Sequence, residues 1–472
     1  MIFSSYGFIF LFLPIVFAGY FLLNQLRYRY IAKLLLVVAS FLFYAQGSAA
    51  FFPFFLASVV GNYVMGTLLS AIREAGTTTR AQSKAALAIG VAANVALLGY
   101  YKYTDFFITN LNAIAHTDVA LRYIVLPIGI SFFTFQLIAF LVDSYHGLTK
   151  SYSIIDYLLF ITFFPQLIVG PIVHHGEMTP QFEDEANGRL NWDNVAAGLF
   201  LFSIGCAKKI LLADPLTIDA QRFFDAVPAQ PGFIEAWWCA IEYTVSYYFD
   251  LSGYADMAIG LGKMFNIAIP HNFNSPYKAR NFQDYWQRWH ITLSRFLGDY
   301  IFRAVYRKGD AYRNFYVASM TTFFVSGFWH GAGWTFIAWG VLNGVFVCAA
   351  SWMKRHNKRF PFIAAFCLTT LGVTALRVLF VSATFSDAWR VYRGMVNIAS
   401  LAQTSFALPS VTGLSAKVFF PLGLVICWFA PNSQTLARQF KSSWLTLLCS
   451  AALIGLSLLR MNNGAAFLYF QF

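Results

Sequence analysis

Long apolar runs separated by short charged stretches are the main pattern of the chain. A helix that crosses the hydrocarbon core of a bilayer needs about 20 mostly apolar residues. The runs cover residues 8–23, 31–46, 49–71, 85–101, 123–145, 154–173, 194–213, 233–262, 314–331, 333–353, 360–383, 416–430 and 443–459. Several are too short to span alone, and we expect half-helices there. Run 233–262 is long and contains Gly253, so we expect two short helices in it. The pattern predicts an all-α, polytopic integral membrane protein with about eleven transmembrane helices plus re-entrant or interfacial helices.

Composition supports a lipid environment. The 472 residues are 58% hydrophobic and 11% charged, whereas a soluble globular chain carries about 25% charged residues. With so little charge the chain could not cover its surface with polar groups, so we expect the lipid bilayer to surround it. The six cysteines are scattered through apolar stretches without the spacing of metal ligands. We therefore predict no metal site and no bound cofactor.

The excess of basic residues indicates orientation in a membrane. The net charge is +12, and Lys and Arg gather in the cytoplasmic loops of inner-membrane proteins. We expect no nucleic acid partner.

The charges of individual loops predict which side of the membrane they face. The first positive charges, Arg27 and Arg29, follow the first apolar run, which places the N-terminus outside. The acidic loop near residues 177–193 is also predicted to be external. Segment 263–313 is predicted to face the cytoplasm because it is rich in basic residues. These are Lys263, Lys278, Arg280, Arg288, Arg295, Arg303, Arg307, Lys308 and Arg313. With no internal repeat or linker, residues 1–472 are predicted to form a single membrane domain.

Within the basic segment, residues 281–302 have the spacing of one amphipathic helix. One broad face is aromatic and aliphatic, and a narrow polar stripe holds Gln283, Gln287, His290 and Ser294. An interfacial helix explains the aromatic and basic residues. It does not explain a histidine that shares a stripe with two glutamines and a serine. We therefore interpret the stripe as the lining of a wet cavity.

The sequence "SGFWHGAGWTFIAWG" places His330 between two apolar runs. An ionisable group at membrane depth is expensive and usually faces a cavity. Gly327 and Gly331 flank it, and such glycines allow a backbone or a thin substrate to approach closely. We predict that these glycines and Trp329 line a substrate path at His330. The alternative is a hairpin tip in which Gly331–Gly333 makes the turn and His330 hydrogen-bonds it.

A second polar group lies in "FDLSGYADMAIGLG", where Asp250, Tyr254 and Asp256 are surrounded by apolar residues. Two acids this close together indicate either the lining of a polar channel or a pair bound to nearby arginines.

The adjacent His174 and His175 end a run that is broken by prolines, and on a helix their side chains would diverge by about 100°. A metal site there is not expected.

Five stretches together resemble the membrane-bound O-acyltransferase family. They are "QDYWQRWHITLSRFLGDYIF", "FFVSGFWHGAGWTFIAWGVLNG", "YYFDLSGYADMAIGLG", "LPIGISFFTFQLIAFLVDSYHG" and "FFPQLIVGPIVHH". The resemblance is to the bacterial branch that O-acetylates alginate, cellulose or peptidoglycan, and more distantly to the membrane protein of teichoic acid D-alanylation. It implies a ring of helices with a central tunnel, His330 as the acyl-transfer base and His290 as the second characteristic histidine. The chain departs from the family where Phe-Arg-Ala is replaced by Phe380-Val381-Ser382-Ala383.

The resemblance implies an O-acetyltransferase of the bacterial inner membrane. Acetyl-CoA or an acyl-carrier thioester would be the donor substrate, and a cytoplasmic acyl-donor protein is a further possible partner. The acceptor would be an extracytoplasmic glycan, reached through a periplasmic esterase-like acetyltransferase. The alternative is a proton-coupled transporter or glycan-export channel in which the two histidines, Asp250 and Asp256 relay protons. The chain lacks the interrupted, symmetry-related halves typical of many transporters.

Overall fold

The computed structural model describes residues 2–75, 79–149, 152–306, 311–402, 414–461 and 468. Every regular element in these ranges is a helix, as the apolar runs predict. Six helical stretches of the described chain are long and apolar enough to cross a membrane: Phe8–Gln25, Arg29–Ala75, Arg80–Ala115, Trp192–Asp225, Trp334–Arg355 and Phe362–Val381. Large apolar side chains such as Ile114 and Leu459 are about four-fifths exposed, which suits a surface that faces lipid. The number of about eleven spans stays a prediction.

Contacts within the chain define two compact units, although the sequence predicts a single domain. The first comprises residues 1–202, 257–270 and 441–447, and the second comprises 203–256, 271–440 and 448–472. The chain passes from one unit to the other within α8 (Trp192–Ala207) and within α10 (Phe233–Met264). Each unit is therefore assembled from segments far apart in the sequence.

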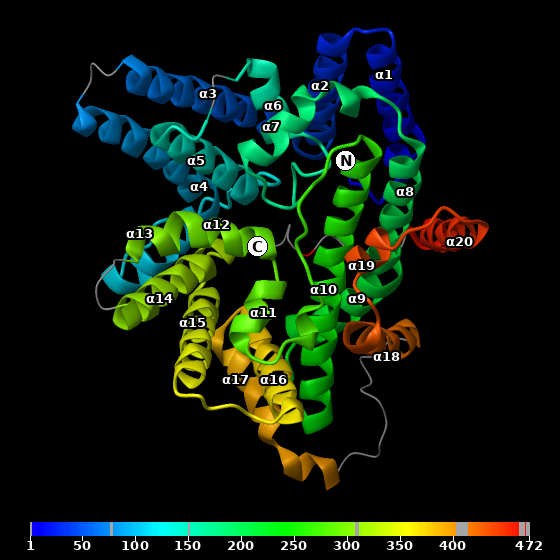
Figure 1. The fold of residues 1–472 in the computed structure, drawn as a ribbon. Coiled ribbons are helices and arrows are strands. Elements are labelled where there is room, and N and C mark those ends of the chain that lie inside the picture. The colour runs from blue at the N-terminus through cyan, green and yellow to red at the C-terminus, as the bar shows by residue number, and fades with distance from the viewer. Residues whose placement is uncertain are drawn as a thin grey trace. The chain divides into compact units, whose positions relative to one another are not determined.

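The first unit holds the N-terminal helices. These are α1 (Leu13–Gln25), α2 (Arg29–Ser48), α3 (Phe52–Ala75), α4 (Arg80–Ala115), α5 (Ile130–His146), α6 (Ile154–Thr162) and α7 (His175–Glu183), with most of α8. Helix α5 packs against α3 and α4, and α6 packs against α2 (Figure 1). Runs 123–145 and 154–173 are only partly helical. The first becomes helical at Ile130, and the second ends its helix at Thr162 and continues as turns.

The second unit holds the helices that carry both predicted catalytic histidines. They are α9 (Asp214–Asp225), most of α10, α11 (Phe282–Arg288), α12 (Ile291–Leu297), α13 (Arg303–Val305), α14 (Ala311–His330), α15 (Trp334–Arg355), α16 (Phe362–Val381), α17 (Phe385–Val396), α18 (Leu414–Phe429), α19 (Ser433–Arg438) and most of α20 (Trp444–Arg460). Helices α14 and α15 form a closely packed hairpin, and α15 also contacts α11 and α16 (Figure 1).

Two predictions about helix continuity are wrong. Run 233–262 forms one unbroken helix, α10, rather than two. A Cβ at Gly253 would lie 2.8 Å from the carbonyl oxygen of Gly205, so the glycine permits close packing against α8 rather than a break. Conversely, residues 281–302 do not form one helix. The chain breaks at Trp289–His290 between α11 and α12 and continues as a π-helical turn, Gly298–Phe302. Arg307 and Lys308 of the basic segment lie outside the described residues.

Candidate active site

His330 is the last residue of α14, at the tip of the α14–α15 hairpin. A Cβ at Gly327 would lie 2.5 Å from the carbonyl oxygen of Phe336, and a Cβ at Gly331 would lie 2.2 Å from the Phe336 ring. Both glycines therefore let α15 approach α14. The close approach expected at these glycines is therefore made by the second helix of the hairpin, and a substrate path beside them stays a prediction. His330 lies at a hairpin tip, as in the alternative interpretation, but its ring bonds to α14 rather than to the turn.

The hydrogen bond of His330 assigns its tautomer. Nδ1 lies 2.6 Å from the carbonyl oxygen of Ser326, one turn earlier on the same helix. A carbonyl oxygen can only accept, so Nδ1 carries the proton and donates. The lone pair of the neutral ring is then on Nε2. This is the atom that can take a proton from a reacting hydroxyl.

Aromatic rings enclose His330, which is 3% exposed. The ring centroids of Trp329 and Trp339 each lie 4.9 Å from the imidazole, and that of Phe380 lies 5.6 Å away. Trp329 is itself buried. The enclosure keeps bulk water away from the imidazole, which strengthens any electrostatic interaction made there.

His290 sits at the break between α11 and α12 with φ 46°, in the left-handed region that non-glycine residues rarely adopt. Asn272 secures the break. Its carbonyl oxygen accepts from Ile291 N at 2.9 Å, and its Oδ1 accepts from the backbone N and Oγ1 of Thr292 at 3.1 and 2.9 Å. His290 is 3% exposed. It lies outside the candidate spans, and burial lowers its pKa to about 3, so the imidazole is neutral at pH 7.

One cluster of aromatic rings connects the surroundings of the two histidines. Trp289, the neighbour of His290, stacks on Tyr247 with a centroid distance of 5.8 Å. The Tyr247 ring lies 5.2 Å from Phe380, which contacts His330. Helices α10, α11 and α16 therefore bring the two sequence motifs into one packed region. Sequence spacing alone gave no indication of Asn272 or of this cluster.

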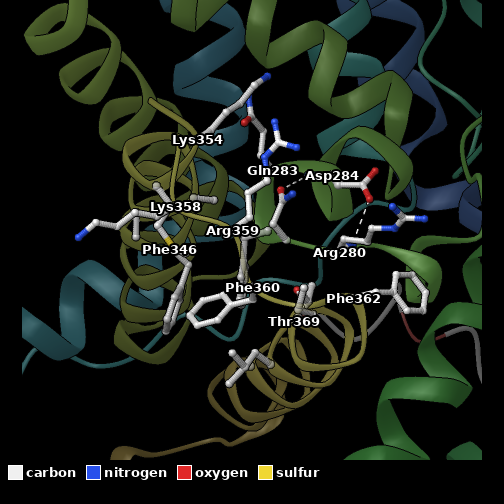
Figure 2. Close-up of a pocket in the computed structure, with 18 of the residues that line it drawn as sticks. Arg280, Gln283, Asp284, Phe346, Lys354, Lys358, Arg359, Phe360, Phe362 and Thr369 are labelled. Atoms are coloured by element: carbon white, nitrogen blue, oxygen red, sulfur yellow. Dashed lines mark hydrogen bonds between the residues drawn. The ribbon is translucent and has the colours of Figure 1, made fainter. Parts of the chain in front are cut away.

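The predicted polar stripe of residues 283–294 does not form, because the helix breaks at His290. Gln283 and Gln287 line a cavity of about 840 Å³ between α11, α15 and α16. His290 and Ser294 do not line it, and Ser294 Oγ instead donates to the carbonyl oxygens of Trp286 and Trp289. Figure 2 shows basic side chains around this cavity, from Arg280, Lys354, Lys358 and Arg359. The basic loop after α15 was not singled out from the sequence.

The acidic group of α10 is held in buried ion pairs with lysines. Asp250 Oδ1 lies 2.5 Å from Lys209 Nζ, which also contacts Asp214 at 2.7 Å. Asp256 Oδ2 lies 2.6 Å from Lys208 Nζ, and its Oδ1 accepts from Ser433 Oγ at 2.9 Å. Both acids are paired, as one of the two interpretations predicts, but with lysines rather than the expected arginines. Tyr254 is buried on the same helix, α10, and the lining of a channel by these three residues stays a prediction.

His175 belongs to the first unit and has polar neighbours. Its Nε2 lies 3.2 Å from Asp143 Oδ2, and its Nδ1 lies 2.9 Å from the Tyr152 hydroxyl. The residue is 5% exposed. It joins α5, the start of α7 and the segment before α6.

The fold and this site define a polytopic, helical membrane protein with a rigidly held histidine at a hairpin tip. The model of the membrane-bound O-acyltransferase family matches residues 75–386. The chain is 38% identical to the peptidoglycan O-acetyltransferase of Helicobacter pylori, with 100% of this chain and 98% of the relative covered. It is 35% identical to the probable alginate O-acetylase AlgI of Pseudomonas aeruginosa, over 91% and 81%. It is 26% identical to the teichoic acid D-alanyltransferase of Bacillus subtilis, over 54% and 66%.

The chain therefore belongs to the membrane-bound O-acyltransferase family. The predictions of an all-α membrane fold, an acyltransferase and a multi-pass protein of the inner membrane surrounded by lipid are confirmed. The roles assigned to individual site residues stay predictions.

Proposed function

We propose that this chain takes an acetyl group from a cytoplasmic thioester and passes it across the inner membrane for O-acetylation of an extracytoplasmic glycan. The observation that carries the proposal is the tautomer and fixed position of His330 at the hairpin tip. Similarity over the full length to a peptidoglycan O-acetyltransferase makes peptidoglycan the first glycan to analyse. An exopolysaccharide such as alginate is the next.

In this mechanism His330 is the general base. A hydroxyl is a poor nucleophile at neutral pH and needs a base within hydrogen-bond reach, which is typically worth about 10²–10⁴-fold in rate. With Nδ1 donating to Ser326, Nε2 of His330 accepts the hydroxyl proton. The imidazolium that forms keeps its Nδ1 hydrogen bond to a carbonyl oxygen, which stabilises the charged ring.

His290 has a different role because it stays neutral. With a pKa of about 3 it does not gain a proton near pH 7. A neutral imidazole can still donate one hydrogen bond, and we assign His290 to orienting the thioester through its carbonyl oxygen. The strained backbone at His290, secured by Asn272, fits a residue whose orientation matters.

The cavity of about 840 Å³ is the proposed binding site for the polar end of the donor. Arg280, Lys354, Lys358 and Arg359 offer positive charge to the phosphates of acetyl-CoA or to the phosphopantetheine and acidic surface of an acyl-carrier protein. Basic loops favour the cytoplasmic side of the inner membrane, where such donors are made. We further propose that a periplasmic esterase-like transferase receives the acetyl group and places it on the glycan.

The test is turnover of an acetyl thioester by the purified protein in lipid vesicles. We expect acetyl-CoA or an acetylated carrier protein to be consumed, with acetyl appearing on an added hydroxyl acceptor or on water. A transporter would move a solute without breaking the thioester bond, and that result would refute the proposal. Acetyl analysis of peptidoglycan and exopolysaccharide, in cells with and without the protein, then identifies the glycan.

A further inference from the structure

Arg377 is a charged residue deep within the apolar helix α16, and its side chain is 3% exposed. Removing an ion from water costs several kcal/mol even after the protein relaxes. A buried arginine is therefore normally paired with a carboxylate. No ion pair to Arg377 occurs among the described residues, and its Nε has no hydrogen-bond partner in them.

Aromatic rings surround the guanidinium instead. Its central carbon lies 4.4 Å from the ring centroid of Tyr247, 4.9 Å from that of Phe380 and 5.1 Å from that of Trp289. The side chains of Tyr243, Tyr277 and Tyr285 also lie near the guanidinium. A cation–π contact stabilises a cation more strongly when it is removed from water. The rings thus offset part of the cost of burial, yet they bring no negative charge.

The position of Arg377 connects this charge with the reaction. Trp289, one of its three rings, precedes His290 in the chain. Phe380, another of the rings, contacts the imidazole of His330. An anion attracted to the guanidinium would therefore lie in the same packed region as both histidines.

We propose that Arg377 binds the negative charge that develops on the carbonyl oxygen of the thioester during acetyl transfer. This inference rests on the proposed function. The acceptor oxygen bonds to the carbonyl carbon while its proton moves to Nε2 of His330, and the electron pair of the C=O bond moves to the oxygen. The intermediate then collapses, the C–S bond breaks, and the leaving thiolate takes the proton from His330. Arg377 stabilises the oxyanion, which exists only between these steps.

The lack of a carboxylate partner for Arg377 among the described residues predicts an unusual response to its mutation. Arg377→Met removes the charge without leaving a buried carboxylate unpaired, and replacing a buried ion by an apolar residue of similar volume is often neutral or stabilising. We expect its melting temperature in detergent to be equal to or higher than that of the wild type. Its kcat for thioester consumption should fall by about 10²–10³-fold, the usual loss for one oxyanion donor, while KM stays nearly constant. Arg377→Lys retains a charge but not the planar fork and should recover part of kcat.

Arg460→Met is the matched control, because Arg460 also lies over an aromatic ring, at 6.0 Å from the centroid of Phe419, on another apolar helix. It should keep the wild-type kcat. If Arg377→Met keeps the wild-type kcat while the wild type turns over thioester, the inference is overturned but the proposed function stands. If the wild type itself consumes no thioester, the proposed function is refuted, and the inference about Arg377 is refuted with it.

A binding experiment decides the matter even where Arg377→Met does not fold. A trifluoromethyl ketone analogue of the acetyl thioester forms a tetrahedral adduct that mimics the oxyanion, whereas the methyl ketone analogue mimics the ground state. We expect the wild type to prefer the first analogue, and Arg377→Lys to lose about tenfold or more of this preference. An equal preference in both proteins would overturn the inference.

Discussion

Two buried histidines in the two units of this protein make different contacts. His175 bonds to Asp143 and Tyr152, so its ring connects three segments of the first unit. The Nδ1 bond of His330 stays within its own helix and connects no elements. The rings of Trp329, Trp339 and Phe380 surround its imidazole. The bonds of His175 therefore link segments of the chain, whereas the Nδ1 bond of His330 sets the direction of its ring.

Burial is common to the two histidines and does not distinguish them. Both residues are at most 5% exposed. The bonds of His175 cross between elements, and the Nδ1 bond of His330 lies within one helix turn. A cross-linking bond contributes to stability, and a bond within one helix turn mainly fixes the tautomer and direction of the ring. Mutation of His175 should therefore lower mainly the stability of the protein, and mutation of His330 should lower mainly its activity.

The largest effect is expected for His330→Gln. Glutamine keeps a polar group at the hairpin tip but cannot act as a base near pH 7. Glycan acetylation in cells should fall to the level of a strain that lacks the protein, since a general base contributes about 10²–10⁴-fold. The amount of protein in the membrane should not change. Acetyl esters released from isolated glycan by mild alkali measure the result, and wild-type acetylation in this variant would contradict the assignment.

His175→Gln should show the opposite pattern. Loss of its bonds leaves the Asp143 carboxylate and the Tyr152 hydroxyl without their imidazole partner, at a cost of about 1–3 kcal/mol in stability. The melting temperature in detergent should fall, while kcat per folded molecule stays at the wild-type value. Asp143→Asn serves as the partner control and should lower the melting temperature in the same direction. A drop in kcat without loss of stability would place His175 in the chemistry and end the comparison.

Neutralising Lys358 and Arg359 together tests the proposed donor cavity. Removing two positive charges from its lining should raise KM for acetyl-CoA by roughly threefold to tenfold and leave kcat unchanged. The wild-type KM should also rise with salt, and the variant should respond less. Arg393→Gln, an exposed arginine on α17, is the control and should bind donor normally. Unchanged KM in the double variant would remove the cavity from the binding site.

The smallest expected effect is the part of the pH dependence of stability that His290 causes. Its folded-state pKa of about 3 lies below the ordinary value of about 6.5. As pH falls below 6.5 the unfolded chain gains a proton that the folded chain does not, so stability decreases toward pH 3. From pH 7.5 to 5.5 this residue should cost the wild type about 1 kcal/mol. His290→Asn, which tolerates the left-handed backbone, should show a smaller fall in melting temperature over that range. An equal fall in both proteins would contradict this account.

Sequence patterns predicted the helical membrane fold because it depends on local composition, and motifs singled out the two histidines, whose roles stay predictions. They did not predict the break at His290, because its stabilising partner, Asn272, lies 18 positions earlier and forms its bonds only in the folded chain. The opposite error at Gly253 has a related cause. A glycine within a helix signals either a break or close packing, and only the position of the neighbouring α8 decides between them.

Arg377 illustrates a third limit. Run 360–383 reads as a spanning helix, and a single arginine within it does not change that pattern. Val381 stands where the family's Phe-Arg-Ala motif has its arginine, and the buried guanidinium lies one turn earlier, at Arg377. Its importance depends on rings from α10, α11 and α16 that come together only on folding.

The rate of acetyl transfer in a single turnover by purified protein in vesicles tests the role of His330 most directly, with His330→Gln and His356→Gln compared side by side. His356 is a matched control, since its Nδ1 also lies near a carbonyl oxygen one turn earlier, at 2.9 Å from that of Trp352, but its side chain is exposed. We expect His356→Gln to transfer acetyl at the wild-type rate and His330→Gln to be slower by at least about 10²-fold, with both proteins equally folded. Equal rates in the two variants would contradict the assignment of His330 as the base.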